Sequence, residues 1–137
     1  MDKYEVSLKA FNDEIRDFTK KMIPAEIVKL QTKIVLEALR RVVMRTPVDT
    51  GRARGNWHVT INRRSDHVNA ALRDPDGSKT IADGYAAIKD LPPFSTVWIT
   101  NNLEYIEFLE HGSSKQAPEG MVALTVDELR QMFDLKG

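Results

Sequence analysis

The sequence predicts an α+β fold in which a helical N-terminal third, made of two helices, packs on a small, mainly antiparallel sheet with further short helices. A stripe of apolar residues with helical spacing runs from Phe11 to Val42, and two later segments have the composition of strands. The chain has 137 residues, of which 42% are hydrophobic and 29% charged, with no internal repeat. We therefore expect one domain spanning residues 1–137.

The N-terminal third has the apolar periodicity of two helices. Apolar side chains recur every three or four positions, first at Phe11, Ile15, Phe18 and Met22, then at Ile27, Leu30, Ile34, Ala38 and Val42. Proline costs about 3 kcal/mol inside a helix but is tolerated at its first position. One helix should therefore end near Met22, and a second should run from Pro24 or Ala25 to about Arg45. We expect the N-terminal helix, within residues 1–23, to be mobile or peripheral.

A structured turn and a strand follow the second helix. Residues 46–56 read TPVDTGRARGN, in which Asp49 and Thr50 can hydrogen-bond nearby backbone amides and the two glycines, Gly51 and Gly55, permit positive φ. From position 57 the sequence WHVTI alternates apolar and polar residues, which is typical of a half-buried strand. Trp57 should lie in the core at the entrance of this strand.

Further helices and strands are expected in the second half. The sequence DGS at 76–78 predicts the start of a helix that ends at Leu91, before two prolines. Residues 94–100, FSTVWIT, are β-branched and aromatic and predict a strand. Asn102 is expected to cap a short helix that ends at Gly112.

The C-terminal stretch predicts a loop followed by a helix. Residues 113–120 are rich in loop-forming residues, and residues 121–124 could form a short strand. Thr125 and Glu128 have the spacing of a capping box, which should open the last helix.

Residues with catalytic or metal-binding chemistry are sparse. The chain has no cysteine, which excludes disulfides, Cys-ligated metals and thiol nucleophiles. Of the three histidines, His58 lies on the polar face of its strand, and His111 is one helical turn from Glu107 without further ligands nearby. Glu104, Glu107 and Glu110 could hold a hard cation, but a solvated acidic face fits them better. We expect no enzyme, no cofactor and no bound metal.

The neutral net charge conceals a polarised chain. Twenty basic residues balance twenty acidic ones, yet residues 40–64 contain seven arginines and one acid, a local charge of +6, and residues 101–137 have a local charge of −4. Three interpretations are open: a DNA-binding module using the basic patch from Arg40 to Arg64, head-to-tail association of copies, or pairing of the charges within one monomer. The longest apolar runs fall far short of the roughly 18 residues of a membrane span, so we expect no membrane partner and synthesis in the cytosol.

Three segments of the chain resemble one known family. They read RTPVDTGRARGNW at 45–57, TNNLEY running to LEHG at 100–112, and SSKQAPEGMV at 113–122. Together they resemble tail-completion (neck) proteins of long-tailed bacteriophages, the group that includes minor tail protein Z-like, head-tail joining proteins. The order and spacing match over residues 23–133. The matching residues with local structural roles are Pro47, Asp49, Thr50, Gly51, Trp57, Asn101, Asn102, Tyr105, Gly112 and Gly120.

The resemblance implies a structural role in a virion. Subunits of such a protein are expected to assemble as a ring at the tail end or neck, after a stage in the host cytoplasm. The implied partners are other copies of the chain, a head-tail connector or adaptor protein, and a tail terminator or tail tube protein, with DNA passing through the lumen. No catalysis is implied.

Two surfaces are candidates for the contacts between subunits. Arg52 and Arg54 could pair with carboxylates of Glu104, Glu107 or Glu110 on the next subunit. The alternative is that Arg52 caps carbonyl groups at the end of the second helix. A second surface is expected in the loop residues Gln116, Ala117, Pro118, Met121 and Val122. The four apolar side chains among them, all but Gln116, should be solvent-exposed in a monomer.

Overall fold

The computed structural model describes residues 3–112 and 120–133, and this part of the chain confirms the α+β fold. The helical N-terminal third and a two-stranded antiparallel sheet are both present. The elements are α1 (Lys3–Thr19), α2 (Pro24–Arg45), α3 (Arg52–Gly55), β1 (Trp57–Ile61), α4 (Ser78–Ala87), β2 (Val97–Asn101), α5 (Ile106–Glu110) and α6 (Val122–Phe133).

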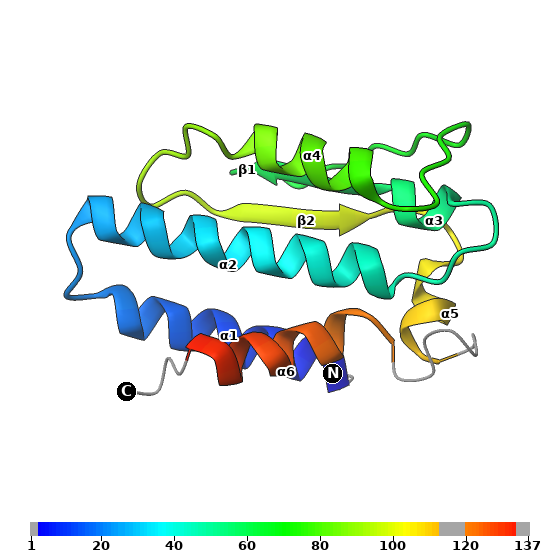
Figure 1. Ribbon diagram of the computed structural model, residues 1–137. Helices are drawn as coiled ribbons and strands as arrows, with labels where there is room; N and C mark the ends of the chain where they lie inside the picture. Colours follow the sequence, from blue (N-terminus) through cyan, green and yellow to red (C-terminus); the bar gives the residue numbers. More distant parts are fainter. Residues whose placement is uncertain (1–2, 113–119, 134–137) are drawn as a thin grey trace.

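Helix α2 is the centre of the molecule (Figure 1). On one side it meets the sheet and α4, where the buried cluster contains Leu39, Val42, Val43, Trp57 and Met121. On the other side it meets α1 and α6, where the buried cluster contains Phe11, Ile34, Val126 and Leu129. The helix begins at Pro24 and ends at Arg45, as predicted, because proline fits the first helical turn and Pro47 follows the end.

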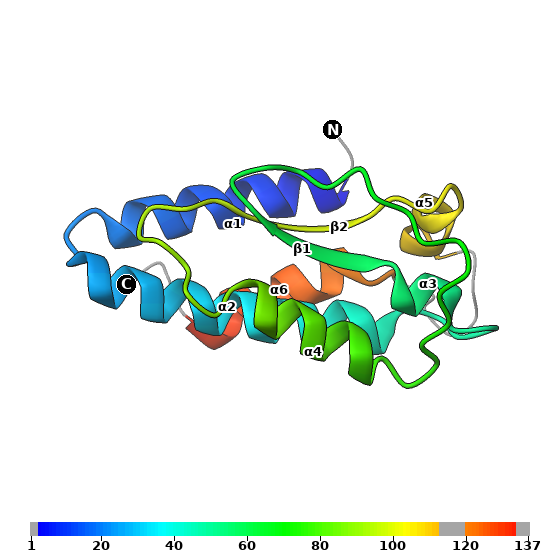
Figure 2. The same cartoon turned by 90° about the horizontal axis from the view of Figure 1, so that it is seen from above.

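The sheet joins β1 and β2 in antiparallel register. Trp57 pairs with Asn101 at one end of the sheet, and Ile61 pairs with Val97 at the other. Figure 2 shows β1 lying between β2 and α4. Beyond Ile61, the Asn62 backbone N–H donates to the Thr96 carbonyl at 2.7 Å, and the Thr96 N–H donates to the Asn62 side chain at 2.8 Å.

The N-terminal helix lies against the C-terminal helix. Phe11 of α1 is buried in the cluster with Leu129 of α6. Beside it, the Arg130 guanidinium makes a two-pronged contact with the Glu14 carboxylate, and this contact raises the pKa of Arg130. Helix α1 is thus peripheral to the sheet but packed on α6 and, through the buried cluster that contains Phe11 and Ile34, on α2.

Several predicted boundaries differ from the structure. The second strand begins at Val97 rather than at position 94, because Phe94 has a left-handed backbone, with φ of 62°. Helix α4 ends at Ala87, before the predicted Leu91. The turn at 46–56 contains the short helix α3. In the described ranges, 3–112 and 120–133, no helix has the length and apolarity needed to cross a membrane.

The two predicted caps in the second half are also wrong. Helix α5 begins at Ile106, and Asn102 instead donates through its side-chain amide to the Ser65 carbonyl at 2.9 Å. Helix α6 begins at Val122, so residues 122–124 are helical rather than extended, and Thr125 lies inside the helix instead of capping it. Gly112 does follow the end of α5 with φ of 85°, as predicted.

Candidate assembly interface

The turn after α2 is fixed by one buried hydroxyl group. The Thr46 hydroxyl donates to the Val42 carbonyl at 2.6 Å and accepts the indole N–H of Trp57 at 2.8 Å. Thr46 is fully buried, and Trp57 is 7% exposed, so the prediction that Trp57 is a core residue is confirmed. The end of α2 and the start of β1 are held together by this contact.

Gly51 gives the turn its tight shape. Its φ is 86°, and a Cβ atom at this position would lie 2.6 Å from the backbone nitrogen of Pro75. Thr50 accepts the Arg52 backbone N–H through its hydroxyl at 3.3 Å, as expected. Gly55 does not have a positive φ, because it lies within α3. Asp49 is exposed, and among the described residues its side chain has no hydrogen bond to support the turn.

Arg54 has an internal role, and its predicted pairing with another subunit stays a prediction. Its guanidinium donates to three backbone carbonyls, those of Thr46 at 3.3 Å, Met44 at 3.0 Å and Pro75 at 2.7 Å. It therefore caps the C-terminus of α2 and ties the segment before α4 to it. The capping function considered for Arg52 belongs to Arg54.

Arg52 contacts a different part of the motif. Its guanidinium carbon lies 5.8 Å from the ring centroid of Tyr105, a cation–π contact. Its Nε atom is buried and has no hydrogen-bond partner within the described part of the chain. Next to it, the Asn101 side-chain amide donates to the Ala53 carbonyl at 2.9 Å. These contacts join the turn at 46–56 to the segment that follows β2.

Glu110 also has an internal role, and its predicted pairing with another subunit stays a prediction. Its carboxylate accepts the backbone N–H groups of Met121 at 3.0 Å, Val122 at 2.8 Å and Ala123 at 3.0 Å. These are unpaired donors at the start of α6, and a carboxylate there is favoured by the helix dipole. Gly120 permits the approach, because a Cβ atom would lie 2.2 Å from the Glu110 carbonyl oxygen.

The second predicted surface is only partly described. Met121 is fully buried in the cluster beside Trp57, so the expectation that it is exposed in a monomer is wrong. Val122 is half-buried and packs against the same cluster. The cap supplied by Glu110 draws both residues inward. Gln116, Ala117 and Pro118 lie outside the described residues.

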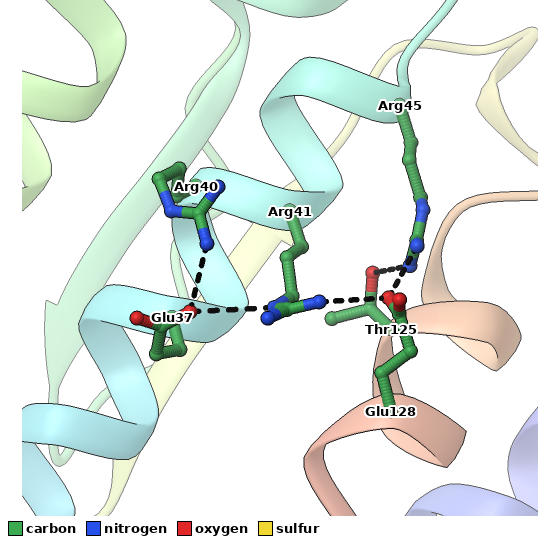
Figure 3. A network of polar contacts seen from close by, with 6 residues as sticks. All are labelled: Glu37, Arg40, Arg41, Arg45, Thr125 and Glu128. Carbon is green, nitrogen blue, oxygen red and sulfur yellow. Dashed lines mark hydrogen bonds and ion pairs between the residues drawn. The ribbon is translucent and has the colours of Figure 1, made fainter. Parts of the chain in front are cut away.

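The arginines at the end of α2 pair within the monomer (Figure 3). Arg41 and Arg45 converge on the Glu128 carboxylate of α6, while Glu37 takes contacts from Arg40 at 2.9 Å and Arg41 at 3.3 Å. Burial opposes ionisation of Glu128, but hydrogen bonds from Arg45 and Arg41 outweigh it and lower its pKa. Intramonomer pairing therefore accounts for these three arginines of the basic patch.

The histidines do not form a catalytic arrangement with acidic groups in the described residues. His58 of β1 meets His67 edge-on, with ring centroids 5.0 Å apart. Burial, followed by the proximity of His67, lowers the pKa of His58. No cluster of three metal-ligating side chains occurs within residues 3–112 and 120–133.

Two of the predicted interface carboxylates remain available at the surface. Glu104 and Glu107 are exposed, and neither side chain has an ion pair in the described part of the protein. Glu104 precedes α5, whereas Glu107 and Glu110 lie within it. The three glutamates therefore do not form the single helical face that was expected from their spacing. The aromatic residue between them and Glu110, Phe108, is 68% exposed.

Sequence reasoning missed the residue that starts α4. Asp74 is buried, and its carboxylate accepts both the backbone N–H of Thr80 at 2.8 Å and the Thr80 hydroxyl at 2.7 Å. The Asp74 N–H donates to the Gly51 carbonyl at 3.1 Å, which attaches α4 to the motif turn. The sequence signal was that Asp74 lies six positions before Thr80, and no standard capping pattern has this spacing.

Comparison with protein-family models, with curated proteins and with solved structures found no match to this chain. Its function is therefore argued from its own residues. The residues that carry the family resemblance, apart from positions 113–119, gather at the end of the molecule formed by α3, α5 and the start of α6 (Figure 1).

Proposed function

We propose that this protein is a structural virion protein that completes the tail or the head-tail junction (neck) of a long-tailed bacteriophage. In this proposal, copies of the chain form a ring between the head connector and the tail tube. The ring has no catalytic function. Its neighbours are a connector or adaptor protein on the head side and a tail terminator or tail tube protein on the other.

One observation carries this proposal. The motif segment at 45–57 is distant in sequence from the motif residues at 100–112 and 120–122, but the three form one bonded unit. Asn101 bonds to Ala53, Arg52 lies on Tyr105, and the Glu110 carboxylate caps the helix that begins at Val122. A shared sequence pattern is more informative when its parts build one local structure, because chance similarity has no reason to select residues in mutual contact.

Disruption of the gene in a phage that encodes this protein tests the proposal. We expect DNA-filled heads and separate tails in lysates examined by electron microscopy, with joining restored by the wild-type chain supplied from a plasmid. Gold-labelled antibody should bind the neck or the tail end of intact particles. Normal joining without the protein would overturn the proposal.

DNA binding by the basic patch is the competing outcome. Four arginines of the patch already have protein partners: Arg40, Arg41, Arg45 and Arg54. A DNA-binding module would show tight binding to duplex DNA that weakens steeply as salt rises. We expect only weak binding, and a steep salt dependence together with normal head-tail joining would favour the DNA-binding function instead.

A further inference from the structure

Two histidines from different parts of the chain meet beside the sheet. His58 lies on β1 and His67 in the segment between β1 and α4; their ring centroids are 5.0 Å apart, with the ring planes inclined at 65°. Two imidazoles that bind one tetrahedral ion, each through a nitrogen about 2.0–2.1 Å from it, have ring centroids about 5 Å apart. The spacing of this pair is therefore that of two ligands of one metal ion.

The face of the sheet that carries His58 contains polar atoms without partners. His58 pairs with Thr100 across the sheet, and Thr60 shares their face because alternate residues of a strand point the same way. The His58 Nε2 atom and the two threonine hydroxyl oxygens are buried and have no hydrogen-bond partner within the described part of the chain. Buried polar atoms are nearly always satisfied by protein, water or an ion. With its proton on Nδ1, His58 offers the lone pair of Nε2 to a cation.

Two asparagines from separate motif segments hold the segment that carries His67. The Asn102 side-chain amide donates to the carbonyls of Ser65 at 2.9 Å and His67 at 3.3 Å. The Asn56 side chain is fully buried; it accepts the Asn69 backbone N–H at 2.8 Å and donates to the Asn69 carbonyl at 3.1 Å. The backbone is thus fixed on both sides of His67, and metal affinity depends on such support of the ligands.

The pair is open to an ion from solvent on one side. His67 is exposed, whereas His58 is half-buried, so an ion can reach the exposed ring while the buried one removes part of its water. Imidazole nitrogen favours zinc, copper and nickel, whereas calcium and magnesium favour oxygen ligands. The chemistry of the two side chains therefore selects a transition metal.

We propose that His58 and His67 together bind one divalent transition metal ion, for which zinc is the probe, with water completing the coordination. The bound ion fastens the segment at 62–69 to the sheet and stabilises the folded chain. The sequence led us to expect no metal, because His111 has no further ligands nearby, but the fold brings the other two histidines together. The inference does not rest on the proposed function.

Zinc binding by the purified, untagged full chain tests the site. In isothermal titration calorimetry the wild type should bind one equivalent of zinc, and zinc should raise the melting temperature until EDTA is added. His58→Gln and His67→Gln should each abolish both effects. His111→Gln changes the third histidine and is the matched control, which should bind zinc like the wild type. Calcium at the same concentration should cause no shift.

A further variant tests the support of the ligands. Asn102→Ala keeps both imidazoles but frees the segment that carries His67, so it should weaken zinc affinity by about 10–100-fold. Melting in EDTA shows whether each variant is folded. His67→Gln changes an exposed side chain and should melt like the wild type there, so it decides the matter if His58→Gln is unstable. Unchanged zinc affinity in Asn102→Ala would contradict the positioning role of that residue.

Three results would overturn the metal site. The first is a wild-type chain that shows neither binding heat nor a change of melting temperature with zinc, which would leave water to satisfy the buried polar atoms. The second is zinc binding that survives in both His58→Gln and His67→Gln, which would assign the ion to other surface groups. The third is loss of binding in His111→Gln, which would place the ion at that histidine instead.

Discussion

Thr46 satisfies two buried groups with one hydroxyl, since a hydroxyl both donates and accepts. It accepts the N–H of Trp57 while donating to a carbonyl in the last turn of α2. Burying an indole N–H without an acceptor is costly, so the position of Trp57 in the core depends on this residue.

We expect Thr46→Val to lower the free energy of unfolding by about 1–3 kcal/mol, because the shape is kept while the Trp57 N–H loses its acceptor. Chemical denaturation measures this change. Thr96→Val, at an exposed site whose side chain makes no hydrogen bond among the described residues, is the control and should stay within about 0.5 kcal/mol. In a Trp57→Phe background the cost of Thr46→Val should shrink, and an equal cost in both backgrounds would contradict the assigned hydrogen bond.

His58 makes stability depend on pH. Burial and the nearby His67 lower its folded-state pKa below the ordinary 6.5. Between the two values the unfolded chain binds more protons, so the free energy of unfolding decreases as pH falls from about 6.5 through the folded pKa. We expect His58→Gln to flatten this part of the pH profile in melting experiments. His67→Gln leaves the burial in place and should flatten it less; an unaltered slope in His58→Gln would refute the assignment.

A helix or strand could be predicted where the residues that define it lie within its own stretch of sequence. Pro24 and the apolar stripe mark α2 within its own sequence, and the alternation from Trp57 marks β1. The start of α6 could not be predicted, because its cap is a carboxylate from α5 brought close by the fold. Because Thr125 and Glu128 have the spacing of a capping box, the sequence predicted that this helix begins after Thr125, whereas it begins at Val122.

The candidate interface was predicted only in part for the same reason. Arg54 and Glu110 have the charge and motif context of contact residues, but the fold supplies each with backbone partners that no sequence spacing indicates. Phe94 was assigned to a strand because aromatic residues favour strands. Its left-handed backbone is imposed by bonds at Asn62 and Ser95.

Removal of the Glu110 cap should loosen the start of α6. Glu110→Ala should lower the free energy of unfolding by about 1–2 kcal/mol, since three N–H groups lose a charged acceptor. Hydrogen exchange at the amides of residues 121–123 should accelerate more than elsewhere in α6. Glu107→Ala, on the same helix but exposed, should leave both quantities near wild type; equal exchange in the two variants would count against the cap.

At the scale of the whole molecule, α2 and α6 connect two buried clusters. Val122 packs against both of them, and α2 contributes Leu39 to one and Ile34 to the other. A shared central helix makes it difficult for one layer to unfold while the other persists. We therefore regard the two clusters as one cooperative core.

Leu129→Ala tests this cooperativity. Leu129 is 1% exposed in the cluster with α1, and its truncation should cost about 2–5 kcal/mol. In a Trp98→Phe background, fluorescence reports on Trp57 in the other cluster. We expect fluorescence and far-UV circular dichroism to shift together to the same lower midpoint. A shift in circular dichroism alone would mean that the layers unfold separately.

The packing of α6 against α1 also sets the order of events during synthesis. Glu14 and Arg130, which join these helices, are 116 positions apart in the chain. At elongation rates of about 5–20 residues per second, the second partner is made on the order of ten seconds after the first. Throughout that interval the apolar stripe containing Phe11 and Ile34 has no covering helix. Nascent chains on neighbouring ribosomes therefore present the same uncovered stripe to one another.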